Sequence, residues 1–577
     1  MKSPHSSKGD DVMASASLEH EENAVHEVDG DTLPNSYYQG KYFVGTFIAT
    51  GFAALSGVGG FSFAAPILSV LNADLGPDPN YVWIGLMYTL MIGIGFSIVG
   101  RLTDIFGRRY FYIFGSLLAL VGDVVCATAK NIPTMIGGTV IIALAAAVQL
   151  SFLAALGEIT PIKHRFMANA FMYVWIAVPA GFGPTISYAF VLHTSAGWRW
   201  CYYFLIIVNA CAVVLYYFFY YPPTFHMKHA NTTKWELTKK FDYIGLFLYT
   251  VGITLFLLGI SWGGSVYPWK SAAVISTTVI GVLATVAFGF WEFRRSLEEP
   301  LMPPRVLTDF WFVTAAFYGL SVIFPQMVFG VYTSDLKYGS ILCLVFSVPY
   351  ISGAIAAAVA RYITHVKWQL IVCLVISTAL IGANASATVD NRTTIICLTT
   401  IGGFLLGYAE GVSLTLCSVF VKDQTDIGSA VGAAGTLRFM IATIGSTIYI
   451  SVLQNRTSTT ISEIVPAALI EAGLPLSSIP AFIVAVSTGS FDDIPGVTPE
   501  IIGVGIRAFR EALVAAFNTV WLTTIAFGLL SLIFAAVSPS SDSLMTNAVV
   551  ALLHQKEASD SSEGEVSVED GSEAKGV

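Results

Sequence analysis

Four ionisable side chains lie inside stretches of the chain that are otherwise almost purely apolar: Asp123, Glu158, Glu410 and Arg438. A charged group in a membrane-spanning helix is costly, and where it occurs it usually serves the movement of an ion or a substrate. A carboxylate in surroundings of low dielectric takes up a proton more readily than one in water. Glu410 and Asp123 are therefore candidates for proton coupling, in which a carboxyl group takes a proton from one side of a membrane and releases it on the other.

Each of these residues also has a structural interpretation. Glu410 can be the partner of Arg438 or of another polar group. Asp123 lies beside small residues and can hold helices together through a hydrogen bond. Glu158 ends an apolar run close to three basic residues, which favours a salt-bridge cluster at the end of that helix. Arg438 lies in a glycine-rich stretch, where it can pair with an acid or contact a substrate.

The composition indicates which elements must position these side chains. Hydrophobic residues make up 55% of the 577 residues, charged residues only 12%, and the mean hydropathy is +0.70. Soluble domains carry about 25% charged residues. Apolar runs of about 18 residues or more recur along the chain, and each is long enough to cross the hydrocarbon core of a bilayer. We predict an all-α polytopic membrane protein, because a β-barrel would show short alternating strands instead.

The apolar runs predict fourteen membrane-spanning helices in groups of six, two and six. We expect them at roughly 44–68, 83–101, 111–129, 134–157, 169–191, 201–221, 243–263, 272–292, 310–332, 340–360, 369–386, 394–419, 428–453 and 512–537. Two six-helix bundles joined by an inserted pair is a layout of transporters, with a substrate site between the halves near the middle of the membrane.

The same pattern divides the chain into segments. Their expected bounds are 1–40 and 538–577 for disordered acidic tails, 41–221 for the first bundle, 222–240 for a linker, 241–292 for the inserted helices and 293–537 for the second bundle. The tails are rich in Ser, Glu, Asp and Gly, a composition typical of disorder. A long connection at 455–510 has helical periodicity. We expect short helices there that lie over the outer mouth, either as a passive plug or as a gate.

Basic residues orient the predicted helices. They crowd every second short loop, whereas the intervening loops hold only Lys130, Arg199, Lys270, Lys337 and Arg392. Short cytoplasmic loops carry the excess of Lys and Arg, so both termini are predicted to be cytoplasmic. In this orientation three glycosylation sequons, at Asn384, Asn391 and Asn455, fall on the outer side.

A compact charged turn, GRLTDIFGRRYFY, separates the second and third predicted spans. Gly100 and Gly107 suit a tight turn between antiparallel helices, because glycine tolerates positive φ and close backbone approach. Arg108 and Arg109 favour the cytoplasmic side. Asp104 can cap the N-terminus of a helix in the other bundle, which would form a latch.

This turn resembles the signature loop of the major facilitator superfamily, which is expected to steady the outward-facing state through its acid. That acid would meet the helix that begins near Gly428. In the fifth span, VPAGFGPTIS resembles the antiporter motif of the same superfamily at Gly183 and Pro184, although Pro179 and Ser187 replace two usual glycines.

Longer stretches narrow the resemblance. QLSFLAALGEITP, YYPPTFHMKH, LGISWGGSVYPW and VPAALIEAGLPLSSIPAFIVAVSTG are similar to the fungal trichothecene efflux pump family, within the fourteen-span drug:proton antiporter type. The resemblance covers roughly residues 40–555 and implies the major facilitator fold. Drug antiporters usually carry an arginine in the fourth span, and this chain has none there.

Proton coupling must therefore rest on other residues. When the two bundles are aligned, Gln149 of the fourth span corresponds to Glu410 of the twelfth, and both are expected to face one central cavity. Arg438 is a further candidate for the cavity, as are Tyr318, Phe324 and Gln326 in the aromatic stretch of the ninth span. A cavity lined by aromatic residues suits a bulky, mostly apolar substrate.

The resemblance and the residues together predict a secondary active transporter that exports hydrophobic small molecules in exchange for protons. Two alternatives remain: a siderophore-iron importer of the same fold, and a membrane sensor or receptor that does not transport. The sequence has no phosphate-binding loop of nucleotide-driven pumps and no metal-ligand cluster, so no cofactor, no metal, no nucleic-acid partner and no enzymatic activity are expected. We expect a monomer in a lipid bilayer, with the plasma membrane favoured over the vacuolar membrane.

Overall fold

The computed structural model describes residues 28–29, 35–222, 242–263, 267–294, 316–421, 427–488, 491, 494–540, 545 and 548–549. This part of the chain is almost entirely helical. Its N-terminal half contains helices α2 (Asn35–Tyr38), α3 (Lys41–Ser62), α4 (Leu68–Leu75), α5 (Trp83–Phe106), α6 (Arg108–Ala127), α7 (Ile132–Leu150), α8 (Phe152–Ile159), α9 (Arg165–Ile176), α10 (Phe182–His193) and α11 (Arg199–Phe219).

The remaining helices follow in chain order. They are α14 (Tyr243–Trp262), α15 (Ala272–Arg294), α17 (Ala316–Met327), α18 (Leu336–Ala356), α19 (Ala360–Ile363), α20 (Val366–Ala383), α21 (Arg392–Val419), α22 (Ile427–Glu471), α23 (Ile479–Thr488) and α24 (Pro499–Val537). Short 3-10 turns lie at Ala65–Ile67, Pro79–Val82, Ile162–His164, Ala357–Val359, Asn384–Ser386 and Leu476–Ser478, and π-helical turns lie at Ala177–Gly181 and Val328–Tyr332.

The prediction of an all-helical membrane protein is confirmed. Thirteen helical segments of the described part are long and apolar enough to cross a membrane, and the shorter apolar helix Tyr318–Tyr332 stands where the ninth span was expected. That helix directly follows the undescribed residues 295–315. The other thirteen predicted spans each coincide with one of the long segments.

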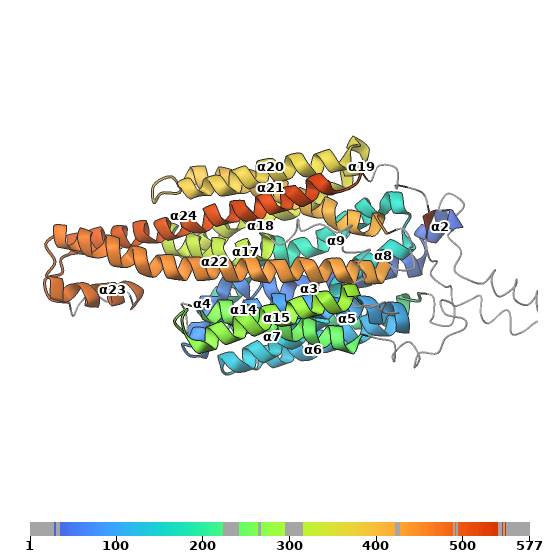
Figure 1. The fold of residues 1–577 in the computed structure, drawn as a ribbon, viewed down its shortest axis with the longest axis horizontal. Helices are drawn as coiled ribbons and strands as arrows, with labels where there is room; N and C mark the ends of the chain where they lie inside the picture. The colour runs from blue at the N-terminus through green and yellow to red at the C-terminus, as the bar shows by residue number, and fades with distance from the viewer. Residues whose placement is uncertain are drawn as a thin grey trace, which may run out of the picture.

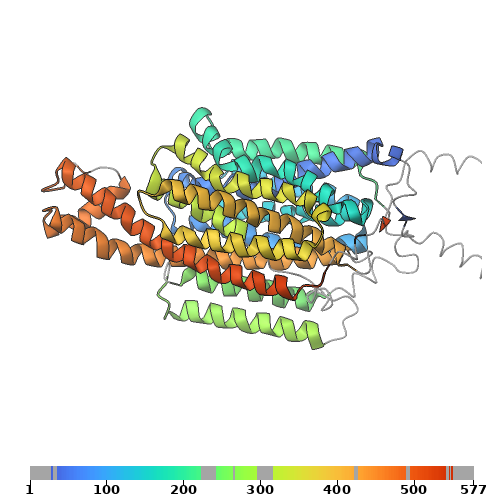
Figure 2. The ribbon, with the colours of Figure 1, turned by 90° about the horizontal axis from the view of Figure 1, so that it is seen from above.

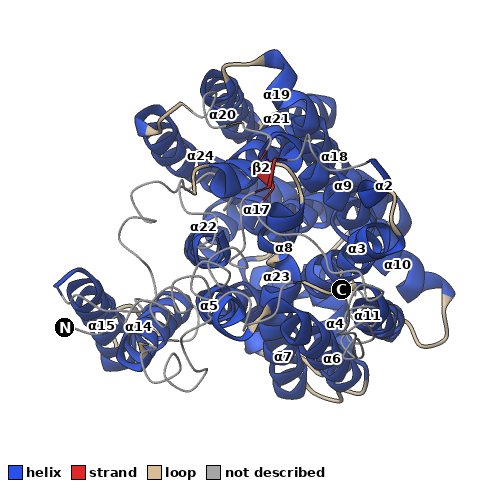
Figure 3. Ribbon diagram, turned by 90° about the vertical axis from the view of Figure 1, so that its right-hand side faces the viewer, coloured by secondary structure: helices blue, strands red, loops and turns tan. Residues whose placement is uncertain are grey.

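The helices run side by side (Figure 1), and the inserted pair lies apart from the main bundle (Figures 2 and 3). Helices α14 and α15 form a hairpin that reaches the bundle through α14. Tyr249, Ile253 and Leu257 of α14 belong to one buried cluster with Leu90 and Ile94 of α5. Helix α14 also contacts α22. The hairpin therefore covers the line along which α5 of the N-terminal half meets α22 of the C-terminal half.

Helices α22 and α24 continue well beyond the ends of the other helices (Figures 1 and 2). Together with α23 they form a projection, here called the stalk (residues 455–510). Its own core contains Val465, Leu469, Phe482 and Ile501. The expectation of separate short helices lying over the outer mouth is wrong, because most of the stalk consists of uninterrupted continuations of two spans. Buried apolar contacts among α22, α23 and α24 stabilise these continuations.

The structure describes only a few residues of the two acidic tails: 28–29 and 35–40 of the first, and 538–540, 545 and 548–549 of the second. Strand β1 (Val28–Asp29) pairs in antiparallel fashion with strand β2 (Ala548–Val549), with Val28 opposite Val549. The tails were expected to be disordered, and this pairing differs from that expectation at four residues. It brings the two ends of the helical part close together, at the end of the molecule opposite the stalk (Figure 1).

Candidate functional site

A cavity lies where the two halves meet. Helices α3, α7, α8 and α9 line it from the N-terminal half, and α17, α18, α21 and α22 line it from the C-terminal half. Most of its wall is apolar or aromatic. Its polar lining residues are Tyr173, Tyr318, Tyr350, Glu410 and Arg438. Such a wall accepts a mostly apolar molecule and offers it a few fixed polar groups.

Glu410 and Arg438 form an ion pair at this cavity, between α21 and α22. The hydroxyl of Tyr173 donates a hydrogen bond to the same carboxylate oxygen, Oε1 of Glu410, over 3.3 Å. Glu410 is only 2% exposed. A buried charge is tolerated when it is paired and hydrogen-bonded, and both conditions hold here. Tyr173 comes from α9, so this carboxylate joins the two halves of the molecule.

Aromatic rings surround the guanidinium of Arg438. Its carbon lies 5.8 Å from the ring centroid of Tyr318 and 5.2 Å from that of Phe439. Phe61 of α3 meets the Tyr318 ring at 5.1 Å between centroids, and Phe96 of α5 meets Phe439 at 5.6 Å. Rings attract a cation through their electron-rich faces. The two rings beside Arg438 belong to the C-terminal half, and each packs against a ring of the N-terminal half.

The second acid, Asp123, is separate from this cavity. It is fully buried in α6, and its Oδ2 accepts a hydrogen bond of 2.7 Å from Nδ2 of Asn209 in α11. Oδ1 of Asn209 in turn accepts a hydrogen bond of 2.7 Å from Nε2 of Gln149 in α7. Gln149 thus points to Asn209 and does not line the cavity at Glu410. The expectation that Gln149 and Glu410 face one cavity is wrong, although the neighbouring Leu150 does line it.

One of the two glycines of the signature loop forms the expected turn, and the other lies within α5. Gly107 joins α5 to α6 with φ of 88°, a conformation that favours glycine. An added Cβ at Gly100 would lie 2.8 Å from the carbonyl oxygen of Gly428 and 2.8 Å from Cα of Gly432. Helix α5 therefore meets the first turns of α22, the helix that the resemblance assigns to the latch. The side chain of Asp104 lies outside the described residues, so the cap itself stays a prediction.

The arginines of the loop contact their own half of the molecule. Arg108 forms a buried ion pair of 3.0 Å with Glu158. This contact agrees with a salt-bridge interpretation of Glu158. Arg109 donates to the carbonyl oxygen of Tyr217 over 2.9 Å, and its guanidinium lies 3.9 Å from the ring centroid of Tyr221. Both arginines thus fix the loop to the ends of neighbouring helices.

The antiporter-like stretch of the fifth span breaks regular helical geometry. The π-helical turn Ala177–Gly181 separates α9 from α10. An added Cβ at Gly183 would lie 2.9 Å from the carbonyl oxygen of Ser62, so α10 and α3 touch at this glycine. Pro184 lines a second, smaller cavity nearer the stalk, together with Phe324 and Phe346.

The three cavity candidates of the ninth span lie in three different places. Tyr318 lines the central cavity, and Phe324 lines the smaller one. Gln326 is exposed and lines neither of them. Its place as a cavity residue is therefore wrong: Gln326 is two residues after Phe324, which turns its side chain to the opposite side of the helix.

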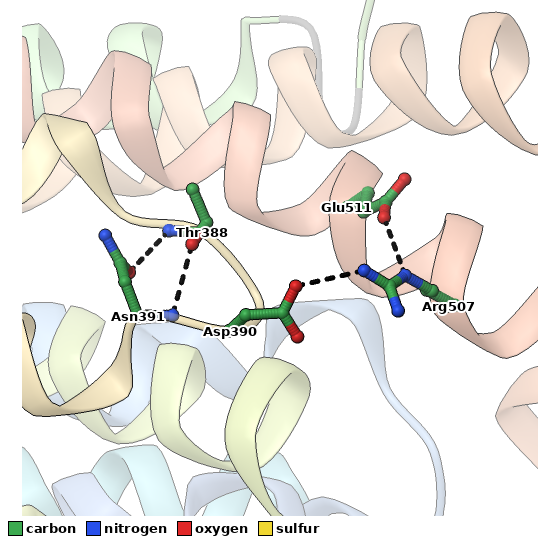
Figure 4. Close-up of polar contacts among 5 residues, drawn as sticks. All are labelled: Thr388, Asp390, Asn391, Arg507 and Glu511. Carbon is green, nitrogen blue, oxygen red and sulfur yellow. Dashed lines mark hydrogen bonds and ion pairs between the residues drawn. The ribbon is translucent and has the colours of Figure 1, made fainter.

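The three sequons differ in accessibility. Asn384 is fully buried, and its Nδ2 donates to Oγ1 of Thr399 over 3.1 Å, so a glycan there is incompatible with this fold. Asn455 lies within α22 and donates to the carbonyl oxygen of Ser451. Asn391 and Thr388 form a reciprocal turn, and the adjacent Asp390 pairs with Arg507 of the stalk over 3.0 Å (Figure 4).

Further polar contacts cross between the halves near the signature loop. Arg165 of α9 donates to the carbonyl oxygens of Gly157 and of Ser418, which lies in α21. Asn169 of α9 donates to Oγ1 of Thr415 over 2.9 Å. Four residues with buried polar contacts were not predicted as site residues: Arg165, Asn169, Tyr173 and Asn209. Each is a lone polar or basic residue in or beside an apolar run, which is the only sequence feature that distinguishes it.

Comparisons with known proteins agree with this architecture. The sequence profile described as the fungal trichothecene efflux pump family matches residues 6–574. The trichothecene efflux pump TRI12 of Trichoderma arundinaceum is 28% identical over 549 residues, which cover 90% of each protein. The MFS-type transporter prx5 of Penicillium rubens is 27% identical over 511 residues, covering 85% of this chain and 90% of that protein.

A solved structure shows the same fold. The major facilitator superfamily proton:xylose symporter XylE superposes with a TM-score of 0.54 at 14% sequence identity, covering 89% of this chain and 99% of that one. The similarity at this level concerns the arrangement of helices.

Proposed function

The chain belongs to the fungal trichothecene efflux pump family, and from this premise we propose that it exports hydrophobic small molecules in exchange for protons. It is a transmembrane efflux transporter of the major facilitator fold. Family membership establishes efflux, whereas the coupling to protons and the identity of the substrate are proposed here. Trichothecenes, which its relatives' names specify, are the first substrates to test.

One observation carries the coupling proposal. The buried carboxylate of Glu410, at the cavity wall, pairs with Arg438 of the C-terminal half and accepts a hydrogen bond from Tyr173 of the N-terminal half. Protonation of Glu410 removes the charge that Arg438 and Tyr173 both bind. The link between α9 and α21 then weakens, and the halves can separate at this point. Loss of the proton restores the link, so proton binding and opening of the cavity are coupled.

The test is the exchange of Glu410 for a residue that cannot ionise. We expect Glu410→Gln to abolish the accumulation of a labelled trichothecene driven by an imposed pH gradient in vesicles. Downhill exchange of the same compound should persist, because the shape of the cavity is kept. Glu463→Gln, which neutralises an exposed acid in the stalk part of α22, is the matched control and should behave as wild type.

An unchanged response of Glu410→Gln vesicles to the pH gradient would refute coupling at this residue. Loss of downhill exchange together with coupling would instead indicate that Glu410 binds the substrate. The two outcomes separate a proton carrier from a ligand of the transported molecule.

The substrate is proposed to be uncharged overall. The polar groups of the cavity are one ion pair and tyrosine hydroxyls, which together carry no net charge. A charged substrate would leave one unbalanced charge in a buried site. Relatives with efflux names favour export over siderophore uptake. A sensitivity panel of toxins, azoles and iron chelates on cells that lack or overexpress the protein tests both the substrate and the direction.

The orientation in the membrane is also a proposal. We place the signature loop and both termini in the cytoplasm and the stalk outside, in the plasma membrane, with the protein acting as a monomer. The excess of basic residues in alternate loops supports this orientation. The outer position of Asn391 and Asn455 makes them the sequons to test by glycosidase treatment, and a fluorescent tag would separate plasma membrane from vacuole.

The same proposal includes three further features: the latch at Asp104, the antiporter motif at Gly183 and Pro184, and the residue bounds of the two bundles.

A further inference from the structure

The polar chain of Gln149, Asn209 and Asp123 lies inside the N-terminal half and takes no part in the ion pair at the cavity. It contains an acid that is 0% exposed. Within the described part of the chain, Oδ1 of Asp123 has no hydrogen-bond partner, and Oδ2 has a single amide donor. An ionised carboxylate buried with one neutral donor is far less stable than the neutral acid.

The groups around Asp123 supply no compensating positive charge. Tyr202 of α11, Tyr88 of α5 and Cys126 of α6 lie within electrostatic reach of the carboxyl, and all three are neutral side chains. At one end of α6, Arg108 is paired with Glu158. At the other end, Arg199 of α11 is paired with Asp74 over 3.2 Å.

The neighbouring helices add none either. Helix α7 has no charged residue, α3 has only Lys41 at its first position, and the charged residues of α5 are confined to its last turns. No cation of the described part therefore faces Asp123, from its own helix or from any helix packed against it.

We propose that Asp123 is a neutral carboxylic acid that stores a second transported proton, and that Asn209 positions it. This inference rests on the proposed proton-coupled function and adds a site in the other half of the molecule. Gln149 fixes the amide of Asn209 by donating to its Oδ1, so that the amide nitrogen faces Asp123. In the proton-releasing step, the O–H bond of the carboxyl breaks and the proton passes to a water molecule. The carboxylate that remains keeps the hydrogen bond from Asn209.

The polar chain of Asp123, Asn209 and Gln149 is buried, but two residues next to it in the sequence or in space line the cavity. Gln149 directly precedes Leu150, and Val58 directly follows Gly57. Leu150 and Val58 both line the cavity. Gly57 packs against the side chains of Gln149 and Leu150, and the hydroxyl of Tyr88 donates to its carbonyl oxygen. Movement of α3 against α7 would therefore admit water from the cavity to the polar chain.

Infrared spectroscopy of the purified full-length protein in lipid tests the protonation state without a substrate. At neutral pH we expect a carbonyl band of a protonated carboxylic acid that disappears in Asp123→Asn, shifts in Asn209→Ala and remains in Glu410→Gln. Thr399→Val, which removes a buried side-chain hydrogen bond in the other half, is the matched control and should leave the band unchanged. A spectrum in which no such band depends on Asp123 would overturn the proposal.

Vesicles test the transport role. We expect Asp123→Asn to lose the pH-gradient-driven part of accumulation while counterflow of a labelled trichothecene continues, and Asn209→Ala to shift the pH dependence of transport. If Asp123→Asn fails to fold, the infrared spectrum of Asn209→Ala takes its place: a shifted carbonyl band supports the proposal, and an unchanged band contradicts it. If the band is present but transport ignores the pH gradient even in wild type, the proposed function fails and the neutral acid stands. If transport responds to the gradient equally in wild type and Asp123→Asn, the storage role fails alone.

Discussion

At the scale of single residues, Glu410 is the point where the cavity, the ion pair and the contact between the halves coincide. The sequence placed Glu410 and Arg438 in neighbouring spans, and a pairing of the two was one of the interpretations it allowed. It gave no means to find Tyr173 or Asn209. A polar residue in an apolar helix indicates that a partner exists, but only the rotation of each helix in the folded bundle determines which partner it meets.

The ion pair predicts an asymmetry in stability. Arg438→Ala leaves the carboxylate of Glu410 buried without its cation, and removing one partner of a buried pair costs about 3–5 kcal/mol. We expect Glu410→Gln with Arg438→Met to be more stable than Arg438→Ala alone, because no charge is then left unpaired. Thermal unfolding of the purified protein in one detergent measures all of these variants.

Tyr173→Phe is the smaller step in the same series. It removes one hydrogen bond to a charged group, worth about 1.5–3 kcal/mol, and keeps the ring. The contradicting outcome for the series concerns the ion pair itself. If Arg438→Ala is as stable as wild type, Glu410 is neutral in the folded protein and its pairing with Arg438 does not stabilise the fold.

At the scale of elements, glycine decides how closely α5 and α22 approach. The sequence indicated a glycine-dependent turn at Gly107, where φ is positive. It assigned Gly100 to the same turn, but Gly100 lies within α5 and makes its close approach to Gly428 and Gly432 of α22. It missed the length of α22 and α24, because polar residues such as those of QNRTSTTISE are typical of loops. The helical periodicity of this region was visible in the sequence, but the continuation of two spans into it depends on contacts in the stalk core, which no local pattern displays.

The glycine contact between α5 and α22 predicts a conformational effect. In Gly432→Ala the added Cβ would meet Cα of Gly100 at 2.8 Å and the carbonyl oxygen of Phe96 at 2.9 Å. Overpacking of this kind costs about 1–3 kcal/mol. The cost falls on the state in which these helices touch, so we expect increased labelling of cysteines introduced at the signature-loop end.

Gly289→Ala is the control for this substitution. It lies in α15, where an added Cβ meets nothing within 4 Å, so only the higher helix propensity of alanine acts. If Gly432→Ala labels no faster than Gly289→Ala, the two helices do not move apart during transport.

The stalk predicts a local loss of stability. Phe482 is fully buried in the stalk core, whereas Leu476 is 73% exposed. Phe482→Ala should destabilise the stalk by about 3–5 kcal/mol, and Leu476→Ala by far less. Hydrogen exchange in α23 measures the difference, and transport is expected to continue in both variants if the stalk is a passive structure. Loss of transport in Phe482→Ala alone would assign it a gating role.

The stalk also contacts the loop before α21, where Arg507 of α24 pairs with Asp390 (Figure 4). Arg507 also pairs with Glu511 one turn along α24 over 3.1 Å. The side chains of Arg507 and Asp390 are 62% and 73% exposed, and exposed ion pairs contribute about 0–1 kcal/mol. This contact therefore contributes little to the attachment of the stalk, which depends on the continuity of α22 and α24.

At the scale of the whole molecule, polar contacts join the two halves on both sides of the central cavity. Near the signature loop, Arg165 reaches the carbonyl oxygen of Ser418. Towards the stalk, Oγ of Ser347 donates to the carbonyl oxygen of Gly181 over 2.7 Å. The two halves are therefore joined by hydrogen bonds on both sides of the cavity.

This arrangement predicts how the balance between open states can be shifted. Arg165→Ala removes charged hydrogen bonds to carbonyl oxygens at the ends of α8 and α21, each worth about 1.5–3 kcal/mol. We expect spin labels on the two halves at the signature-loop end to report a larger population of long distances. Lys270→Ala, which removes an exposed charge between α14 and α15, should leave the distances unchanged. Identical distance distributions in both variants would contradict a closing role for Arg165.

Much of the whole architecture could be predicted from the sequence. The order of spans follows from hydropathy alone, because each span must satisfy the same bilayer thickness. The position of the inserted hairpin did not follow. It depends on apolar residues of α14 such as Tyr249 and Ile253, and these are indistinguishable in the sequence from residues that face lipid.

The stalk also changes how the protein can be imaged. Helix α22 alone has 45 residues, about 68 Å at the usual helical rise, which exceeds the thickness of a bilayer's hydrocarbon core about twofold. Most of the described part of this 61.9 kDa transporter consists of helices that can span a membrane, and a detergent belt hides such helices in electron micrographs. The stalk projects beyond the other helices and has its own apolar core, so it can serve as an alignment marker, and we expect single-particle reconstruction to succeed without an added antibody fragment.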